Sequence, residues 1–292
     1  MKFADRNSDL SRFTAVPEII EAMLHNERVV DEDQTNPPYV TDALKYTNRP
    51  KKRRKPQPYQ GDETHVERSI DLFGFDEGPM PFQVESWQTL RELDTQRSEA
   101  TGSQAALVTA PTGIGKTECF LGPILDRIIE GRGESTILVY PRRSLLQDQF
   151  GRLLKHLHDI KTSDAYDVTP SVGLRFSDIP LRKAQVPSRS GLVNQHNSVF
   201  KLTKCWCEDD DGEQNPFFLN SGDGWYQLRC PNDHKFGHQQ VVLHRNGLRD
   251  TPPDIILTTL ESLELMALKP NYQTIDQIDT IVLDEVHLLN GT

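Results

Sequence analysis

The sequence predicts an α/β fold in which a parallel β-sheet is flanked by helices. Four short runs rich in β-branched residues lie at Ala105 to Thr109, Ser135 to Tyr140, Pro253 to Thr259 and Asp279 to Asp284. Each run is followed by a segment with helical spacing, as in Ser144 to His158 and Glu261 to Leu268. This alternation is typical of buried parallel strands that are connected by helices.

A glycine-rich segment between the first run and its helix predicts a phosphate-binding loop. It reads APTGIGKT and comprises Ala110, Pro111, Thr112, Gly113, Ile114, Gly115, Lys116 and Thr117. The two glycines let backbone N–H groups face a polyphosphate, and the following helix adds the positive end of its dipole. Lys116 is expected to reach the β and γ phosphates of ATP, and the Thr117 hydroxyl to bind Mg²⁺. An accidental Lys-Thr pair in a glycine-rich turn is the less favoured interpretation, because strand, loop and helix occur in the required order.

An acidic segment at the end of the fourth run predicts the other half of such a site. Asp284 and Glu285 follow the apolar residues TIVL, and His287 lies two positions further along. A carboxylate at the carboxyl end of a parallel strand can hold Mg²⁺ through its water shell, and a neighbouring carboxylate can orient an attacking water. By itself the segment could be a strand that merely exits to solvent. Its place after a phosphate loop favours Lys116, Asp284 and Glu285 as catalytic residues.

Together these motifs resemble those of the first RecA-like lobe of superfamily 2 helicases of the DExH type. FQVESW, Phe82 to Trp87, resembles their glutamine motif, which implies that Gln83 contacts adenine, although an ordinary helix-surface glutamine is an equal alternative. The resemblance places His287 in the nucleotide site. Ala110 replaces the glycine of the strict loop pattern, a variant that helicases commonly carry. The segment LDEVHLLNG is similar to prokaryotic DNA helicases of repair and phage-defence systems, including the DISARM type.

Two further segments resemble the elements with which these helicases contact a nucleic-acid backbone. They are YPRRSLLQDQ and TTLESL, and the expected contacts are Arg142, Arg143, Thr258 and Thr259. All four follow strand ends on the ligand-binding edge of the expected sheet. Arg142 stands where the family usually has Thr, which adds a cation near a phosphate. Loop capping and solvated charge are the alternative roles for these residues.

Residues 141–252 separate the second and third runs, and we expect an insertion at about 165–250, because one crossover needs only about a dozen residues. The insertion contains Cys205, Cys207, Cys230 and His234, whose three thiols and imidazole suit a structural zinc ion, with His238 as a rival ligand. Buried free cysteines beside a surface histidine are the alternative. The aromatic residues of the segment are expected to pack it rather than to stack on unpaired bases: Trp206, Phe217, Phe218, Trp225 and Tyr226.

The first part of the chain has a different composition. Residues 1–78 are interpreted as a helical extension with an amphipathic stretch at Pro17 to Arg28 and a proline-rich linker, and residues 79–292 as the ATP-binding lobe. The run KKRRK, Lys51 to Lys55, is interpreted as solvated charge rather than as a phosphate contact.

Composition limits the class of protein. The formal net charge of −10 argues against a uniformly basic surface but leaves a basic groove open. No run of roughly 18 apolar residues occurs, and Asp5, Arg6 and Asp9 interrupt the place of a secretory signal. Three of the four cysteines cluster, which suits a metal site in a reducing compartment. We therefore expect a cytoplasmic protein without membrane contact.

The sequence thus predicts the ATP-binding lobe of an ATP-dependent helicase or translocase, with DNA favoured over RNA as its partner. In such enzymes a second lobe supplies an arginine to the transition state. No such lobe precedes Thr292, and we expect a fragment, split-gene product or truncation that turns over little ATP unless a second chain completes it. The alternative is a non-catalytic subunit that binds nucleotide or nucleic acid. A metabolite kinase fits the acidic segment and its upstream elements less well.

Overall fold

The fold is described from a computed structural model, which covers residues 57–75, 77–96, 106–108, 115–132, 135–267 and 278–285. It contains two compact units, one ending at Glu130 and the other beginning at Gly131. The amphipathic stretch at Pro17 to Arg28 and the basic run at Lys51 to Lys55 lie outside the described residues. The division expected between residues 78 and 79 stays a prediction.

Three helices form the described part of the first unit. They are α2, Thr64–Phe73, α3, Pro81–Gln96, and α4, Lys116–Ile129, and both α2 and α3 contact α4. Trp87 of α3 is fully buried, and its indole N–H donates to the carbonyl of Glu118 at 2.8 Å. A Cβ at Gly122 of α4 would lie 2.7 Å from the indole nitrogen. The close approach of α3 and α4 therefore depends on glycine at this point.

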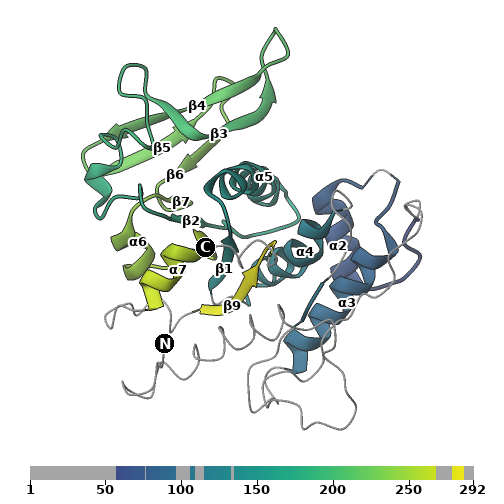
Figure 1. The fold of residues 1–292 in the computed structure, drawn as a ribbon. Coiled ribbons are helices and arrows are strands. Elements are labelled where there is room, and N and C mark those ends of the chain that lie inside the picture. Colours follow the sequence, from purple (N-terminus) through teal and green to yellow (C-terminus); the bar gives the residue numbers. More distant parts are fainter. Residues whose placement is uncertain are drawn as a thin grey trace, which may run out of the picture. The chain divides into compact units, whose positions relative to one another are not determined.

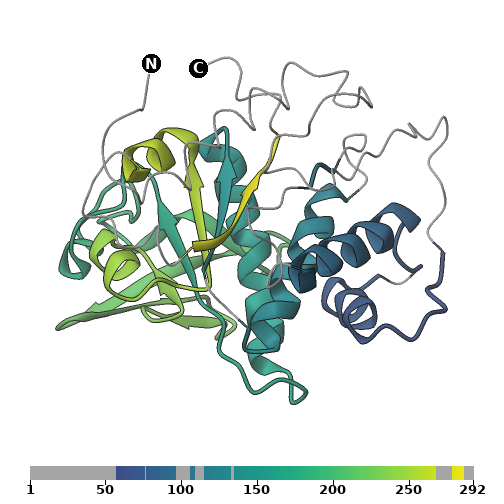
Figure 2. The ribbon, with the colours of Figure 1, turned by 90° about the horizontal axis from the view of Figure 1, so that it is seen from below.

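The second unit contains a five-stranded parallel sheet with the order β7-β2-β8-β1-β9, which confirms the predicted fold class. The strands are β1, Ser135–Tyr140, β2, Val172–Arg175, β7, Val241–Val242, β8, Ile255–Thr259, and β9, Ile278–Leu283. Figure 2 shows β9, in yellow, beside β1. Three predicted runs are confirmed as the strands β1, β8 and β9. Continuous β-branched sequence suits a strand covered on both faces, as β1 and most of β8 are, whereas β9 is only partly buried.

Two strands of this sheet are not predicted by the sequence. β2 and β7 fall within the segment 165–250 that was expected to be an insertion, and their four and two residues are too short for a periodic signal. The strand expected at Ala105 to Thr109 is described only at 106–108, and these three residues are not in a strand. Ala105 and Thr109 themselves lie outside the described residues.

Helices α5, Arg143–Thr162, and α7, Leu260–Ala267, cover opposite faces of the parallel sheet (Figure 1). The crossover from β1 through α5 to β2 and the one from β8 to β9 run in opposite directions along the strand order. Right-handed crossovers of opposite direction place their helices on opposite faces. A short helix, α6, Arg245–Asp250, precedes β8. In the ranges given above, no helix has an apolar stretch that is long enough to cross a bilayer.

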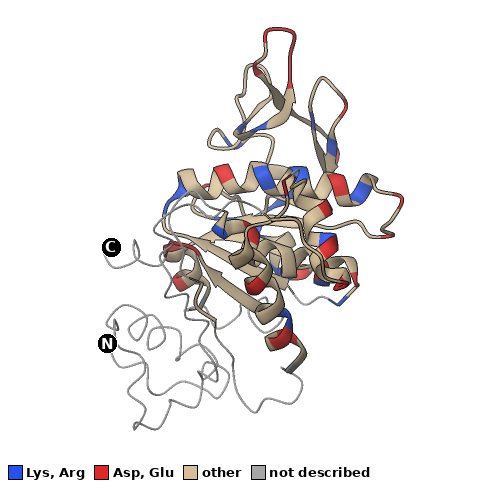
Figure 3. Cartoon of the chain, turned by 90° about the vertical axis from the view of Figure 1, so that its right-hand side faces the viewer, with Lys and Arg blue, Asp and Glu red and all other residues tan. Residues whose placement is uncertain are grey.

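Between β2 and β7 the chain forms a separate antiparallel sheet with the order β3-β4-β5-β6. A single turn of 3-10 helix, η2, Lys183–Gln185, precedes it, and its strands are β3, Val199–Glu208, β4, Gln214–Gly222, β5, Trp225–Arg229, and β6, Lys235–Gly237. One face packs on α5, where the rings of Phe150 and Phe200 lie 6.4 Å apart. The hairpin between β3 and β4 is rich in acidic residues, with the sequence DDDGE at 209–213, and it is among the parts drawn in red in Figure 3.

Tyr226 connects the two sheets of the second unit. Its buried hydroxyl donates to the carbonyl of Val241 in β7 at 2.9 Å and accepts the N–H of Leu243 at 2.7 Å. Phe217 is also fully buried, so the predicted packing role of these two aromatic residues is confirmed. Trp225 differs, because 46% of its surface is exposed.

Candidate functional site

The start of α4 is the described part of the phosphate loop. Gly115 is the N-cap and has a φ of 88°, a left-handed conformation that favours glycine, and the helix begins at Lys116. Lys116 and Thr117 therefore lie in the first turn, where backbone N–H groups and the helix dipole attract anions. The other loop residues, Ala110, Pro111, Thr112, Gly113 and Ile114, lie outside the described residues.

Gln83 holds the start of α4 against α3. Its side chain is 2% exposed, and its amide nitrogen donates to the carbonyl of Gly115 at 3.1 Å, while its oxygen accepts the N–H of Met80 at 2.8 Å. A Cβ at position 115 would come within 2.4 Å of the amide nitrogen, so the glycine also makes room for the glutamine. Gln83 is thus a buried residue rather than an ordinary helix-surface one. Its contact with adenine stays a prediction.

An ion-pair network fixes the other end of α4. The Asp126 side chain is 2% exposed and pairs with Arg68 of α2 and with Arg91 of α3, the latter at 2.9 Å. Arg91 also pairs with Glu130 at 3.0 Å. Burial raises the pKa of the Asp126 carboxyl, and the two guanidinium groups oppose that shift. Sequence reasoning missed this network. The one hint in the sequence is an acid within the largely apolar helix segment PILDRII.

In the second unit, the acidic pair lies at the carboxyl edge of the parallel sheet. Asp284 follows β9 directly, and its N–H donates to the carbonyl of Val139 in β1 at 3.0 Å. The N–H of Glu285 donates to the Asp284 carboxylate at 2.9 Å, and Glu285 has a φ of 51°. Burial and the negative charge of Asp284 raise the pKa of Tyr140. This turn presents both carboxylates where ligands of α/β sheets bind. His287 lies outside the described residues.

The four residues expected to contact nucleic acid lie at the same edge, because Arg142 and Arg143 follow the carboxyl end of β1 and the two threonines are the last residues of β8. Arg142 is exposed. Arg143 is engaged within the unit, since its guanidinium pairs with Asp178 and lies 4.6 Å from the ring centre of Phe176. Its contact with nucleic acid, like that of Arg142, stays a prediction.

The two threonines of the set also have internal partners. The Thr258 hydroxyl is fully buried and donates to the carbonyl of Arg175 at 2.7 Å, which connects the ends of β8 and β2. The Thr259 hydroxyl lies 3.2 Å from that of Ser262 in the first turn of α7. In this structure Thr258 is therefore a strand-bridging residue, whereas Thr259 is only partly buried.

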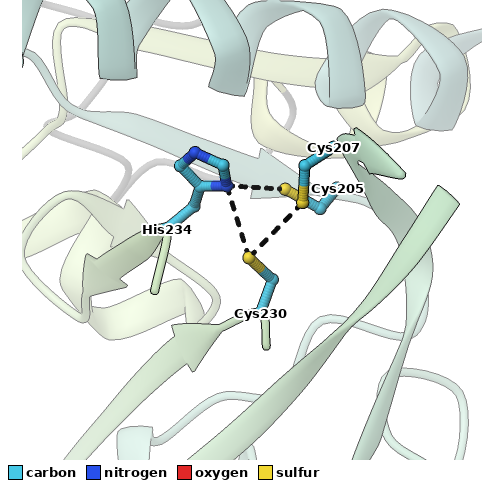
Figure 4. A group of neighbouring side chains, drawn as sticks. All are labelled: Cys205, Cys207, Cys230 and His234. Carbon is cyan, nitrogen blue, oxygen red and sulfur yellow. Dashed lines mark hydrogen bonds between the residues drawn. The ribbon is translucent and has the colours of Figure 1, made fainter. Parts of the chain in front are cut away.

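The antiparallel sheet brings Cys205, Cys207, Cys230 and His234 together, as Figure 4 shows. Their ligand atoms all lie within 4.8 Å of one another, and the sulfurs of Cys207 and Cys230 are 3.7 Å apart. Zn–S bonds of about 2.3 Å in a tetrahedron place sulfurs about 3.8 Å apart. The His234 Nδ1 lies 3.2 Å from the Cys205 sulfur and 3.3 Å from that of Cys230. The donor set and its spacing therefore fit zinc.

The ligand cluster bridges strands that do not pair with each other. Cys205 and Cys207 lie on β3, whereas Cys230 and His234 flank the turn between β5 and β6, and β4 separates the two pairs. His158 of α5 lies against the cluster, with its ring centre 4.9 Å from that of His234. The rival ligand His238 is not in the cluster, and its ring lies 5.8 Å from Tyr226. A metal ion here would cross-link the insertion over β4.

Residues 83–183 match the family model of the DEAD/DEAH box helicases. This match and the similarity to helicases described below support a helicase first RecA-like lobe, at low identity. The match includes Gln83, Lys116 and Arg142, and it ends before the antiparallel sheet begins. The lobe is similar to the Lhr helicase/uracil glycosylase of Escherichia coli (strain K12), with 28% identity over 194 residues. These residues are 66% of this chain and 10% of that protein.

The lobe is also similar to a second relative, the Lhr helicase/ probable uracil glycosylase of Mycolicibacterium smegmatis. The two are 24% identical over 219 residues, which are 73% of this chain and 10% of the relative. The chain thus matches about a tenth of the length of both relatives.

Proposed function

We propose that this lobe binds Mg²⁺ and ATP and drives an ATP-dependent helicase or translocase that acts on nucleic acid. The observation that carries the proposal is the start of α4, where Lys116 follows a left-handed Gly115 whose carbonyl is held by Gln83. This arrangement prepares a helix N-terminus for an anion before the ligand arrives. The match to the DEAD/DEAH box helicases supports ATP as that anion, since ATP is the nucleotide that these helicases use.

The proposed roles follow from charge and position. Lys116 carries a mobile cation to the β and γ phosphates, and the Thr117 hydroxyl and the Asp284 carboxylate hold Mg²⁺, which neutralises the charge that develops on the phosphates. Glu285 accepts a hydrogen bond from the attacking water and orients it. The turn at Asp284 is held to β1 through Val139, so the carboxylate pair has a defined direction.

Calorimetric titration with Mg²⁺-ATP tests this assignment. Lys116→Ala should weaken ATP binding at least tenfold, because it removes the cation that faces the phosphates. Glu285→Gln should leave binding within about twofold, because the amide keeps the size of the side chain and the water-orienting role is needed only for hydrolysis. Lys155→Ala, an exposed lysine of α5, is the matched control and should bind as the unmodified chain does. Equal loss in the Lys116 and Glu285 variants would contradict the division of roles.

The nucleic acid is proposed to follow the carboxyl edge of the parallel sheet, where Arg142 is exposed and Thr259 only partly buried. Single-stranded DNA is the favoured partner, and a fluorescence polarisation assay compares its affinity with that of an RNA oligonucleotide of matched sequence. Arg142→Gln should weaken the binding of both oligonucleotides and reduce the salt dependence of their affinity, as loss of one phosphate contact does. Unchanged affinity would move the nucleic acid away from this edge.

Turnover is proposed to need an arginine from a second RecA-like lobe, supplied by a partner chain or by further sequence. Loss of such an arginine costs roughly 10³-fold or more in rate. The 292 residues alone should therefore bind ATP with little DNA-stimulated hydrolysis. Robust hydrolysis that Lys116→Ala abolishes would contradict this. If the chain binds ATP but DNA does not stimulate hydrolysis even when a second lobe is added, a non-catalytic binding subunit would be favoured.

The Cys/His cluster is proposed to hold a structural zinc ion. Four protein ligands leave no coordination position open to water or substrate, so the ion would stabilise the fold rather than take part in catalysis. Burial raises the pKa of the Cys205 thiol, and a bound cation would reverse that shift because the thiolate is the ligand.

Elemental analysis of the purified chain should find about one equivalent of zinc. Both the Cys205→Ser and the Cys230→Ser variant should lose this zinc. Cys119→Ser is the matched control, because Cys119 is equally buried but belongs to the first unit, and it should keep the metal. Metal-free protein whose thermal stability does not change on chelation would end the hypothesis.

A further inference from the structure

A hollow in the second unit, the β6–β7 pocket, lies outside the sites described above. Its volume is about 280 Å³, and it is lined by Lys161, Thr169, Gly237, His238, Gln239 and Gln240. The first belongs to the last turn of α5, the second to the segment before β2, and the other four to β6 and the turn that follows it. The lining side chains offer an ammonium, a hydroxyl, an imidazole and two amides, and none of them is a carboxylate.

The β6–β7 pocket lies at the amino ends of the parallel strands. The N–H of Val172, the first residue of β2, donates to the carbonyl of Gln240, the residue before β7, at 2.7 Å. The carboxyl edge, with Arg142 and Asp284, lies at the other end of α5, whose 20 residues span about 30 Å. The pocket is therefore separate from the edge proposed to hold nucleotide and nucleic acid.

Positive groups gather around the pocket. Burial lowers the pKa of Lys161, and the nearby charge of Lys235 lowers it further. Burial and the charge of Lys183 likewise lower the pKa of His238. Within the described part of the chain, the one ion pair of Lys235 is a long contact of 3.9 Å with Asp233, and both side chains are more than half exposed. Mutual repulsion of this kind is relieved when an anion binds between the cations.

We propose that the β6–β7 pocket binds a phosphate group, with the ammonium of Lys161 as its central contact. That ammonium donates to the side-chain oxygen of Gln240 at 3.1 Å, which holds the lysine beside the pocket. The same oxygen accepts the N–H of Gly237 at 3.2 Å, so the turn and the lysine share one anchor. An ammonium has three donors, and among the described residues Gln240 takes one of them, which leaves two for phosphate oxygens. Hydroxyl and amide groups such as Thr169 and Gln239 are the usual companions of lysine at phosphates.

The phosphate can come from a nucleic-acid backbone or from a small phosphate compound, and both present the same oxygens. The site itself does not rest on the function proposed above. To keep the two separable, the test uses the full chain with Lys116→Ala, which weakens the phosphate loop. Lys161→Gln is the test variant, and Lys155→Gln, an exposed lysine on the same helix outside the lining, is the control.

Inorganic phosphate is titrated by calorimetry, and a labelled single-stranded DNA oligonucleotide by fluorescence polarisation. Phosphate should bind the background chain and bind the Lys161→Gln chain about tenfold or more weakly, with no change in the Lys155→Gln chain. A parallel loss of DNA affinity in Lys161→Gln alone assigns the phosphate to a nucleic-acid backbone. Unchanged DNA affinity assigns it to a small phosphate compound.

Two results would overturn the proposal. One is absence of phosphate binding in the background chain, and the other is equal phosphate affinity in the Lys161→Gln and Lys155→Gln chains. If Lys161→Gln unfolds, Thr169→Val takes its place, because Thr169 is exposed and its hydroxyl is a lining donor. A Lys161→Gln chain that is less stable but binds phosphate normally would show that the lysine only supports the turn between β6 and β7.

Discussion

Replacing Asp126 by Ala should destabilise the first unit through the two arginines that remain. The Asp126 side chain is 2% exposed, and those of Arg68 and Arg91 are 17% and 25% exposed. Burial raises the pKa of this carboxyl in spite of both partners. The ion pairs therefore offset the cost of burying the charges and add little net stability to the fold.

The magnitude follows from what the substitution leaves behind. Removing one member of a buried ion pair costs about 3–5 kcal/mol, because the remaining charge stays desolvated. Here Arg91 keeps its contact with Glu130 at 3.0 Å, and both arginines reach some solvent. The expected loss is therefore about 2–3 kcal/mol, below the fully buried case. Because α4 begins with Lys116, nucleotide affinity should fall in the same variant.

Urea unfolding measures this loss through the fluorescence of Trp87, in a chain that carries Trp206→Phe and Trp225→Phe. Trp87 is fully buried and bonded to α4, so its signal reports the first unit. Asp71→Ala, an exposed acid of α2, is the matched control and should change stability by less than about 0.5 kcal/mol. Equal destabilisation by Asp126→Ala and Asp71→Ala would refute the role of the network.

Three further perturbations have defined outcomes. Gly115→Ala should lower both the stability of the chain and its ATP affinity, because the position has a φ of 88° and no room for a Cβ. Gly131→Ala is the control, since this glycine has a φ of 65° and open space around it. In urea unfolding it should cost only the backbone strain, roughly 1–2 kcal/mol. Tyr226→Phe should cost about 1–3 kcal/mol in the same assay, because it leaves a buried N–H and a carbonyl beside β7 without their side-chain partner. His244 accepts the N–H of Gly247 through Nδ1, and burial lowers its pKa below 6.5, so this contribution is present above pH 6.5 and is lost as the pH falls through the lower folded value. His244→Asn keeps a capping oxygen and should flatten the pH dependence of unfolding below pH 6.5, and an unaltered profile would count against the assignment.

Local sequence accounts for much of the second unit. The β-branched runs at Ser135 to Tyr140 and Pro253 to Thr259 become β1 and β8 within one or two residues, because strands covered on both faces need continuous apolar sequence. The spacing of Cys205, Cys207, Cys230 and His234 likewise predicted a cluster that the structure forms. Metal ligands can be recognised from sequence because few other residue types can do their chemistry.

Residue type and local order by themselves thus predicted an α/β lobe, an acidic turn and a Cys/His cluster, which the structure contains, and a phosphate loop, of which the structure describes only the end at Gly115 and the start of α4. Only the tertiary structure decided that β2 and β7 extend the parallel sheet, that Arg143 pairs with Asp178, and that Thr258 bridges two strands. It also decided that Asp126 is buried between two arginines of other helices. The physical reason is the separation of the residues along the sequence. A helix start or a strand depends on neighbours a few residues away, whereas these side-chain contacts join residues 35 to 83 positions apart. No local pattern shows which distant residue each side chain will contact.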